Sequence, residues 1–181
     1  MSLDLFKFFN LIEELKHSER QGWKDKEVDR PRDTIASHSF GAALIGWVMA
    51  EKEELDSDKL VKMLIMHDLI MGYVEDYTPE DEEFNSKKEM EREAFDNLVA
   101  DIPNEIEEEF NSMFHELQSQ ETEEAKIAKE SDKLDTLLQA RSYSKQSDES
   151  FLDEFLESYR EYFSSETGKS LVEELESERT D

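Results

Sequence analysis

Two histidines and two aspartates in this chain are the side-chain types that a divalent metal ion prefers. His67 and Asp68 lie next to each other at the end of an apolar segment that begins at Leu60. His38 lies upstream of this pair, and Asp132 lies far downstream. Together they offer two imidazoles and two carboxylates, a mixed nitrogen and oxygen set suited to a metal ion that serves hydrolysis. The residues therefore predict a hydrolytic metal site, provided that the fold brings them together.

Each of these residues also has an ordinary structural interpretation. His38 and His67 share helix faces with apolar residues, where a lone histidine is more often a core residue with satisfied polar atoms. Asp68 is expected at a helix C-terminus, although a negative charge there opposes the helix dipole. Asp132 belongs to a helix whose other positions are expected to be mostly solvated. The remaining histidines, His17 and His115, lie among charged residues and are interpreted as surface side chains.

Helices are the elements that must position these side chains. Five glycines and three prolines in 181 residues leave little turn chemistry for an all-β protein. Apolar residues recur at spacings of three and four, which predicts an all-α fold, a compact bundle of about seven or eight helices. The expected helices span residues 3–20, 34–53, 57–71, 87–100, 104–118, 121–143, 150–163 and 165–178, with Asp56 or Ser57 capping the third. Residues 21–33 are expected to be a polar connection, and residues 72–85 a loop.

The composition excludes several classes of protein. The chain has 181 residues, enough for one domain with a real core. It has no cysteine, which excludes disulfides and any site built on a thiolate. No segment approaches the roughly 18 apolar residues that a membrane span needs. Residues 1–10 lack the pattern of a secretory signal, so the expected location is the cytoplasm.

The charge balance is strongly negative. Lys and Arg total 21, Asp and Glu total 48, and the formal net charge is −27. Such a charge opposes nonspecific binding to nucleic acid polymers and to anionic membranes. The acids are spread along the whole chain, which favours adaptation to high salt, a halophilic protein. The alternative is an ordinary acidic protein with an acidic C-terminal third.

Three segments around the proposed ligands match a known pattern. The first contains Arg20-Gln21-Gly22-Trp23, then Arg30-Pro31 and Ser37-His38. The second contains His67-Asp68-Leu69, then Asp76 and Thr78-Pro79. The third contains Glu124-Ala125-Lys126, then Asp132-Lys133, Gln139-Ala140 and Tyr143. In this order they resemble the HD-domain superfamily of metal-dependent phosphohydrolases, and most closely its 5′-deoxynucleotidase-like branch.

The resemblance implies a domain and a metal site. It covers about residues 3–145, so residues 1–145 are expected to be the phosphohydrolase domain. Residues 146–181 are then an acidic C-terminal helical extension, packed on the domain or on a partner subunit, with possible disorder in the last dozen residues. His38, His67, Asp68 and Asp132 are expected to bind one divalent metal ion, for which Mn, Co, Fe, Ni or Zn is chemically suited.

A phosphate-binding cation is also needed in so acidic a chain. Arg20 is the expected phosphate clamp, because a guanidinium group binds phosphate oxygens bidentately. Arg30 is a second candidate and Arg32 a weaker one. For all three the alternative is a solvated or salt-bridged arginine.

One position departs from the family pattern. Family members typically carry a glutamate three residues after the aspartate of the His-Asp pair, and this chain has Met71 there. A thioether cannot accept or transfer a proton. Asp76 matches the second acid of the region, with Glu75 beside it, and either is a candidate for the catalytic acid or base. Otherwise the substrate needs no such acid, or the protein binds its ligands and hydrolyses poorly.

The expected function is that of a metal-dependent phosphohydrolase that releases phosphate from (deoxy)nucleoside 5′-monophosphates. Three alternatives remain: a catalytically weakened protein that binds metal and a nucleotide-like ligand, an HD hydrolase with another phosphate substrate, and a purely structural helical protein. The amphipathic C-terminal helices, with the family analogy, predict a homodimer.

Overall fold

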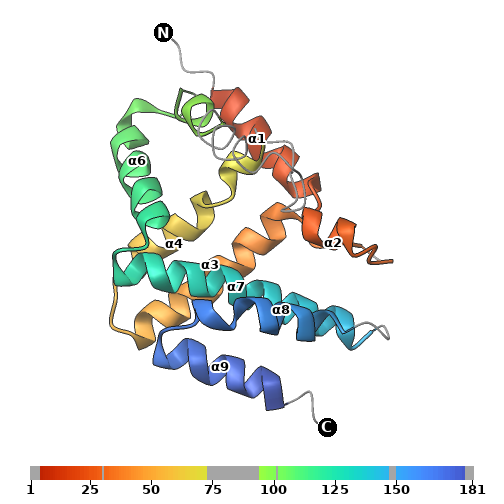
Figure 1. Cartoon of the computed structure of the whole chain (residues 1–181). Helices are drawn as coiled ribbons and strands as arrows, with labels where there is room; N and C mark the ends of the chain where they lie inside the picture. Colours follow the sequence, from red (N-terminus) through yellow and green to blue (C-terminus); the bar gives the residue numbers. More distant parts are fainter. Residues whose placement is uncertain (1–4, 30, 73–93, 101, 147–149, 178–181) are drawn as a thin grey trace. The chain divides into compact units, whose positions relative to one another are not determined.

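Every regular element in the described residues is a helix (Figure 1). The computed structural model describes residues 5–29, 31–72, 94–100, 102–146 and 150–177. The predicted all-α fold is confirmed in these ranges, where an isolated bridge between Glu19 and Thr34 is the one extended pairing. The elements are α1 (Leu5–His17), α2 (Gln21–Asp25), α3 (Ile35–Lys52), α4 (Ser57–Met66), η1 (Leu69–Gly72), α6 (Asn104–Ser119), α7 (Glu123–Ser144), α8 (Phe151–Tyr159), η2 (Arg160–Tyr162) and α9 (Glu166–Ser177), and residues 94–100 are also helical.

Contacts within the chain divide it into two units. The first comprises Met1–Ser37 and Ile65–His115, and the second comprises His38–Leu64 and Glu116–Asp181. Helices α3, α4 and α6 each cross a boundary between the units. His67 and Asp68 therefore belong to the first unit, and His38 and Asp132 to the second.

The first unit contains a short helix that the sequence pattern did not predict. Trp23 of α2 is 1% exposed, so the expected polar connection over residues 21–33 contains an apolar anchor. The backbone N–H groups of Arg20 and Ile35 donate to the carbonyl groups of Asp33 and Ser18, which closes this segment into a loop. Burial of one indole ring is enough to order five residues as a helix, and a pattern search over longer windows misses so short an element.

Helix α7 forms the core of the second unit, which corrects an expectation from the sequence. Its mostly charged sequence predicted a largely solvated helix, yet eleven of its residues are buried, among them Ala125, Ala128, Asp132 and Ala140. The buried residues include Glu130, Ser131 and Thr136, whose polar groups find partners inside the unit. Hydrogen bonding lets a polar helix occupy a core, and hydropathy alone does not show it.

The C-terminal helices α8 and α9 pack on α7 (Figure 1). The Glu130 carboxylate of α7, fully buried, accepts hydrogen bonds from the backbone N–H and hydroxyl groups of both Ser164 and Ser165. These residues precede α9, so a core carboxylate caps the start of that helix. A Cβ atom on Gly168 would collide with Glu130, which explains why the approach requires glycine.

We find no helix within the described part of the chain that combines the length and the apolar character needed to cross a membrane.

Candidate metal centre

His38 is held near the start of α3 by a reciprocal cap. The Thr34 hydroxyl accepts from the backbone N–H of Ser37, and the Ser37 hydroxyl accepts from the backbone N–H of Thr34. This capping pattern fixes the first turn of the helix immediately before His38. The His38 side chain is fully buried.

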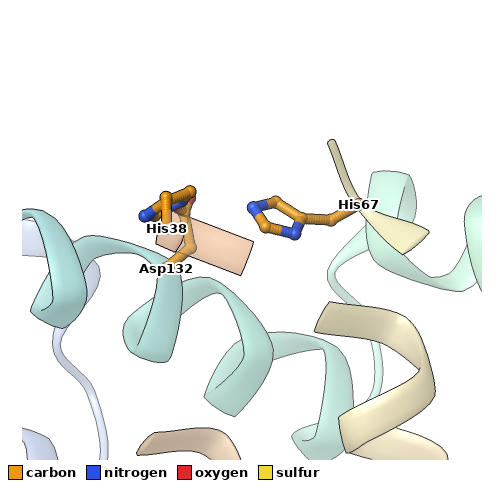
Figure 2. A group of neighbouring side chains, drawn as sticks. All are labelled: His38, His67 and Asp132. Atoms are coloured by element: carbon orange, nitrogen blue, oxygen red, sulfur yellow. The ribbon is translucent and has the colours of Figure 1, made fainter. Parts of the chain in front are cut away.

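Two carboxylates of α7 face the two nitrogens of the His38 ring. Asp135 Oδ2 lies 2.6 Å from Nδ1, a hydrogen bond in which the ring N–H donates. Asp132 Oδ1 lies 3.2 Å from Nε2 (Figure 2). With Nδ1 protonated, a neutral ring presents the Nε2 lone pair toward Asp132, so a cation is needed between these two atoms.

The geometry of this pair fits a metal ion. Nitrogen and oxygen atoms bonded to one such ion at about 2.0–2.2 Å lie about 3.0–3.5 Å apart, and the 3.2 Å separation of His38 Nε2 and Asp132 Oδ1 falls in that range. Both residues belong to a group of side chains that could hold a metal ion. A proton shared between the two atoms is the competing explanation of the same distance.

Asp135 is a site residue that the sequence reasoning missed. It lies three residues after Asp132, so the two carboxylates share a face of α7. A carboxylate that accepts from the second nitrogen of a histidine fixes the tautomer and orientation of a metal-binding ring. Gly41 of α3 makes room for it, because a Cβ atom there would collide with Asp135 Oδ1. The i, i+3 spacing from Asp132 is the signal that could have found Asp135.

The other oxygen of Asp132 faces two lysines of the same helix. Asp132 Oδ2 lies 3.3 Å from Lys129 Nζ and 3.2 Å from Lys133 Nζ. Asp132 itself is 6% exposed. Its two oxygens therefore have different surroundings, His38 on one side and two ammonium groups on the other.

The His67-Asp68 pair lies in a turn of the first unit. Helix α4 ends at Met66, five residues earlier than predicted, and the backbone N–H of Met71 donates to the carbonyl of Asp68 as η1 begins. His67 Nε2 lies 3.3 Å from Asp68 Oδ2, and both side chains are partly buried. The tighter 3₁₀ turn replaces the end of the predicted helix, so Asp68 is not a helix-terminal residue as expected.

The remaining predicted residues divide into those that the structure describes and those outside it. Arg20 Nη1 lies 4.0 Å from Asp33 Oδ2, and Arg32 Nη1 lies 2.9 Å from Glu19 Oε2. Both guanidinium groups thus have acidic neighbours within the first unit. Met71 lies in η1 and is partly buried. Arg30, Glu75 and Asp76 lie outside the described residues.

A family model described as HD domain matches residues 12–175 of this chain. A protein of Dictyostelium discoideum named 5′-deoxynucleotidase HDDC2 is 31% identical over 95% of this chain and 96% of its own length. The human protein of the same name is 29% identical over 97% of this chain and 86% of its own length.

Solved structures share the fold. The crystal structure of the PH0347 protein from Pyrococcus horikoshii OT3 is similar with a TM-score of 0.78 and 33% identity, over 95% of this chain and 96% of that one. A predicted metal-dependent phosphohydrolase from Magnetospirillum magnetotacticum MS-1 gives a TM-score of 0.73 at 24% identity, over 96% of this chain and 90% of that one. At that identity the second likeness concerns the fold alone.

Proposed function

This chain belongs to the HD domain family, and on that premise we propose that it is a metal-dependent phosphohydrolase acting on deoxynucleoside 5′-monophosphates. The curated relatives named 5′-deoxynucleotidase support this substrate class, because they match the chain over most of its length. The observation that carries the proposal is the buried His38 ring between Asp132 and Asp135. Few purposes other than binding a cation explain an imidazole with carboxylates at both nitrogens.

We propose four protein ligands for the metal. His38 Nε2 and Asp132 Oδ1 come from the second unit, and His67 and Asp68 from the first. Two neutral imidazoles and two carboxylates suit Mn, Co, Fe, Ni or Zn and leave coordination positions for other ligands. When bound, such an ion supplies a Lewis acid for a phosphoryl oxygen and lowers the pKa of a water molecule.

Other residues of the chain have proposed roles in handling the substrate. Asp76, with Glu75 beside it, is proposed to take the proton of the attacking water, the role that the thioether of Met71 cannot fill. Arg20 and Arg30 are proposed to bind phosphate oxygens through their guanidinium groups. The negative charge of the chain, −27, supports a small substrate rather than a nucleic acid polymer.

A phosphate-release assay tests the proposal. Protein loaded with Mn or Co is given a panel of deoxynucleoside and ribonucleoside 5′-monophosphates, beside Asp132→Asn and a control, Asp96→Asn, an exposed aspartate of the first unit. We expect release by the wild type and the control, and near-background release by Asp132→Asn. Folded wild-type protein that releases no phosphate with either metal would contradict the proposal.

Met71 favours a second candidate, a catalytically weakened protein that binds metal and a nucleotide-like ligand. The test is Met71→Glu, which restores an acid at this position. A large gain from near zero supports the weakened protein. An already active enzyme that changes little supports the hydrolase.

We also propose that the protein is a homodimer. The apolar faces of α8 and α9 are buried within the second unit and do not support it, but α3 does. Residues 35–50 carry no acid, lysine or arginine, and this helix exposes large apolar side chains at Phe40, Leu44, Trp47 and Val48. An uncharged face is where a second equally acidic copy can approach with least repulsion. Light scattering in molar salt tests this, with Trp47→Glu expected to give a monomer; a monomeric wild type would contradict it.

A further inference from the structure

Lys129 and Lys133 form a concentration of positive charge in a chain dominated by acids. Their Nζ atoms lie 3.3 Å and 3.2 Å from the same oxygen of Asp132, so two ammonium groups face one carboxylate. Other lysines of the second unit are matched with one acid each, as in the pairs Lys59 with Glu116 and Lys126 with Glu123. The pair at Asp132 therefore leaves a net positive charge next to a proposed metal ligand.

Aromatic rings accompany these lysines. Lys133 Nζ lies 4.7 Å from the ring centroid of Tyr159 and 5.7 Å from that of Tyr162. Lys129 Nζ lies 5.9 Å from the ring centroid of Tyr162. A ring face attracts an ammonium group without neutralising its charge. The two tyrosines thus hold the lysines in place and leave their charge available to an anion.

The exposure of these groups agrees with a binding role. The Lys133 side chain is 16% exposed and that of Lys129 is 39% exposed, so both are partly removed from water but open to it. A partly desolvated ammonium group binds an anion more strongly than a fully solvated one. A phosphate monoester carries a charge of about −2 at neutral pH, which matches two lysines better than one.

We propose that Lys129 and Lys133 bind the phosphate group of the substrate, and that Tyr159 and Tyr162 position them for this. The inference rests on the proposed phosphohydrolase function and deepens it, because it assigns the substrate's anion to residues that no relative's name identifies. Asp132 then has two roles, with Oδ1 directed at the metal and Oδ2 aligning the lysines. The tyrosines come from α8 and η2, so the segment after residue 145 contributes to the site.

The tyrosines are tested by a pair of substitutions at one position. Tyr159→Leu removes the ring and is expected to raise KM about two- to tenfold, with kcat and metal content unchanged. Tyr159→Phe keeps the ring face and is expected to retain the wild-type KM, which a role of the hydroxyl would not allow. Equal KM values for the two variants and the wild type would overturn the positioning role.

The lysines are tested by Lys129→Met and Lys133→Met, which remove the charge and keep an unbranched side chain. The control is Lys126→Met on the same helix, where the lysine pairs with Glu123 at 2.6 Å. Affinity for inorganic phosphate is measured by calorimetry, with metal content by elemental analysis. We expect each variant to bind phosphate about tenfold or more weakly at unchanged metal content, and the control to match the wild type.

Two results would overturn the inference, and one of them leaves the proposed function intact. If the wild type binds metal and releases phosphate while both variants keep the phosphate affinity of Lys126→Met, the lysines do not bind the anion and only the inference fails. If the wild type binds neither metal nor phosphate, the proposed function fails and the inference with it.

Discussion

Asp135 determines how His38 presents its second nitrogen. The 2.6 Å hydrogen bond from His38 Nδ1 holds the ring with Nε2 directed at Asp132, and Gly41 leaves the space that Asp135 occupies. The four proposed ligands could be selected from the sequence by residue type, because histidine and aspartate are rare choices at the end of an apolar segment. Asp135 could not, because one aspartate among many acids carries no signal until its partner is known.

Removing this support is expected to weaken metal binding without abolishing the site. We predict that Asp135→Asn lowers the metal affinity about 10- to 100-fold, because the ring loses its charged partner. Gly41→Ala should act in the same direction by displacing Asp135. Metal titration of both variants checks this, with Asp58→Asn, at an exposed position of α4, as the control. An unchanged affinity in Asp135→Asn would show that His38 needs no such partner.

At the scale of the elements, Glu116 joins the end of α6 to α4 and to the start of α7. Its carboxylate accepts from Lys59 Nζ at 2.6 Å and from the hydroxyl of Thr122, the residue that caps α7. Burial alone would raise the pKa of Glu116, but the hydrogen bonds from Lys59 and Thr122 and the charge of Lys59 outweigh it, and the pKa is lowered from 4.5.

This lowered pKa makes the stability dependent on pH. A carboxyl whose pKa is lower in the folded state contributes stability above its unfolded pKa, and that contribution is lost as the pH falls through the folded value. We predict that Glu116→Gln lowers the free energy of unfolding by about 1–2 kcal/mol at pH 7, and that the difference from the wild type shrinks as the pH falls below 4.5.

Denaturant unfolding at pH 7 and at acidic pH measures this difference. Glu108→Gln, at an exposed position of α6, is the matched control and should leave the stability nearly unchanged at both values. A deficit of equal size at neutral and acidic pH would mean that the charge of Glu116 is not its source.

Most helices could be predicted because their apolar periodicity is strong. The expected helices at 34–53, 104–118, 121–143 and 165–178 differ from α3, α6, α7 and α9 by one or two residues at each end. Asp56 caps α4 as predicted, with its carboxylate accepting from the backbone N–H of Lys59. Helix α2 was missed because one tryptophan orders it, and the burial of α7 was missed because its core contains polar residues such as Glu130.

For the whole molecule, the domain division proposed from the sequence remains a proposal. We retain residues 1–145 as the phosphohydrolase domain and residues 146–181 as an acidic extension. Within the second unit α8 and α9 pack on α7, and Tyr159 lies over Lys133 beside Asp132. The extension is therefore expected to matter for substrate binding as well as for stability.

The net charge of −27 predicts a dependence of stability on salt. Repulsion among the carboxylates destabilises the folded state, and salt screens it, since the Debye length falls from about 10 Å at 0.1 M to about 3 Å at 1 M. We predict that the thermal midpoint rises between about 0.1 M and about 2 M KCl, with most of the screening complete near 1 M. Melting curves across this series check it, and a midpoint that does not rise would contradict adaptation to high salt.

Metal content is the measurement that tests the central claim most directly. The wild type, His38→Ala and the control His115→Ala, at an exposed position of α6, are loaded with Mn or Co, dialysed and analysed by elemental analysis in molar salt. The account predicts about one metal ion per chain in the wild type and in the control, and a large loss in His38→Ala, because that substitution removes the ring that Asp132 and Asp135 hold. A folded wild type without metal, or a His38→Ala variant that retains it fully, would contradict the account.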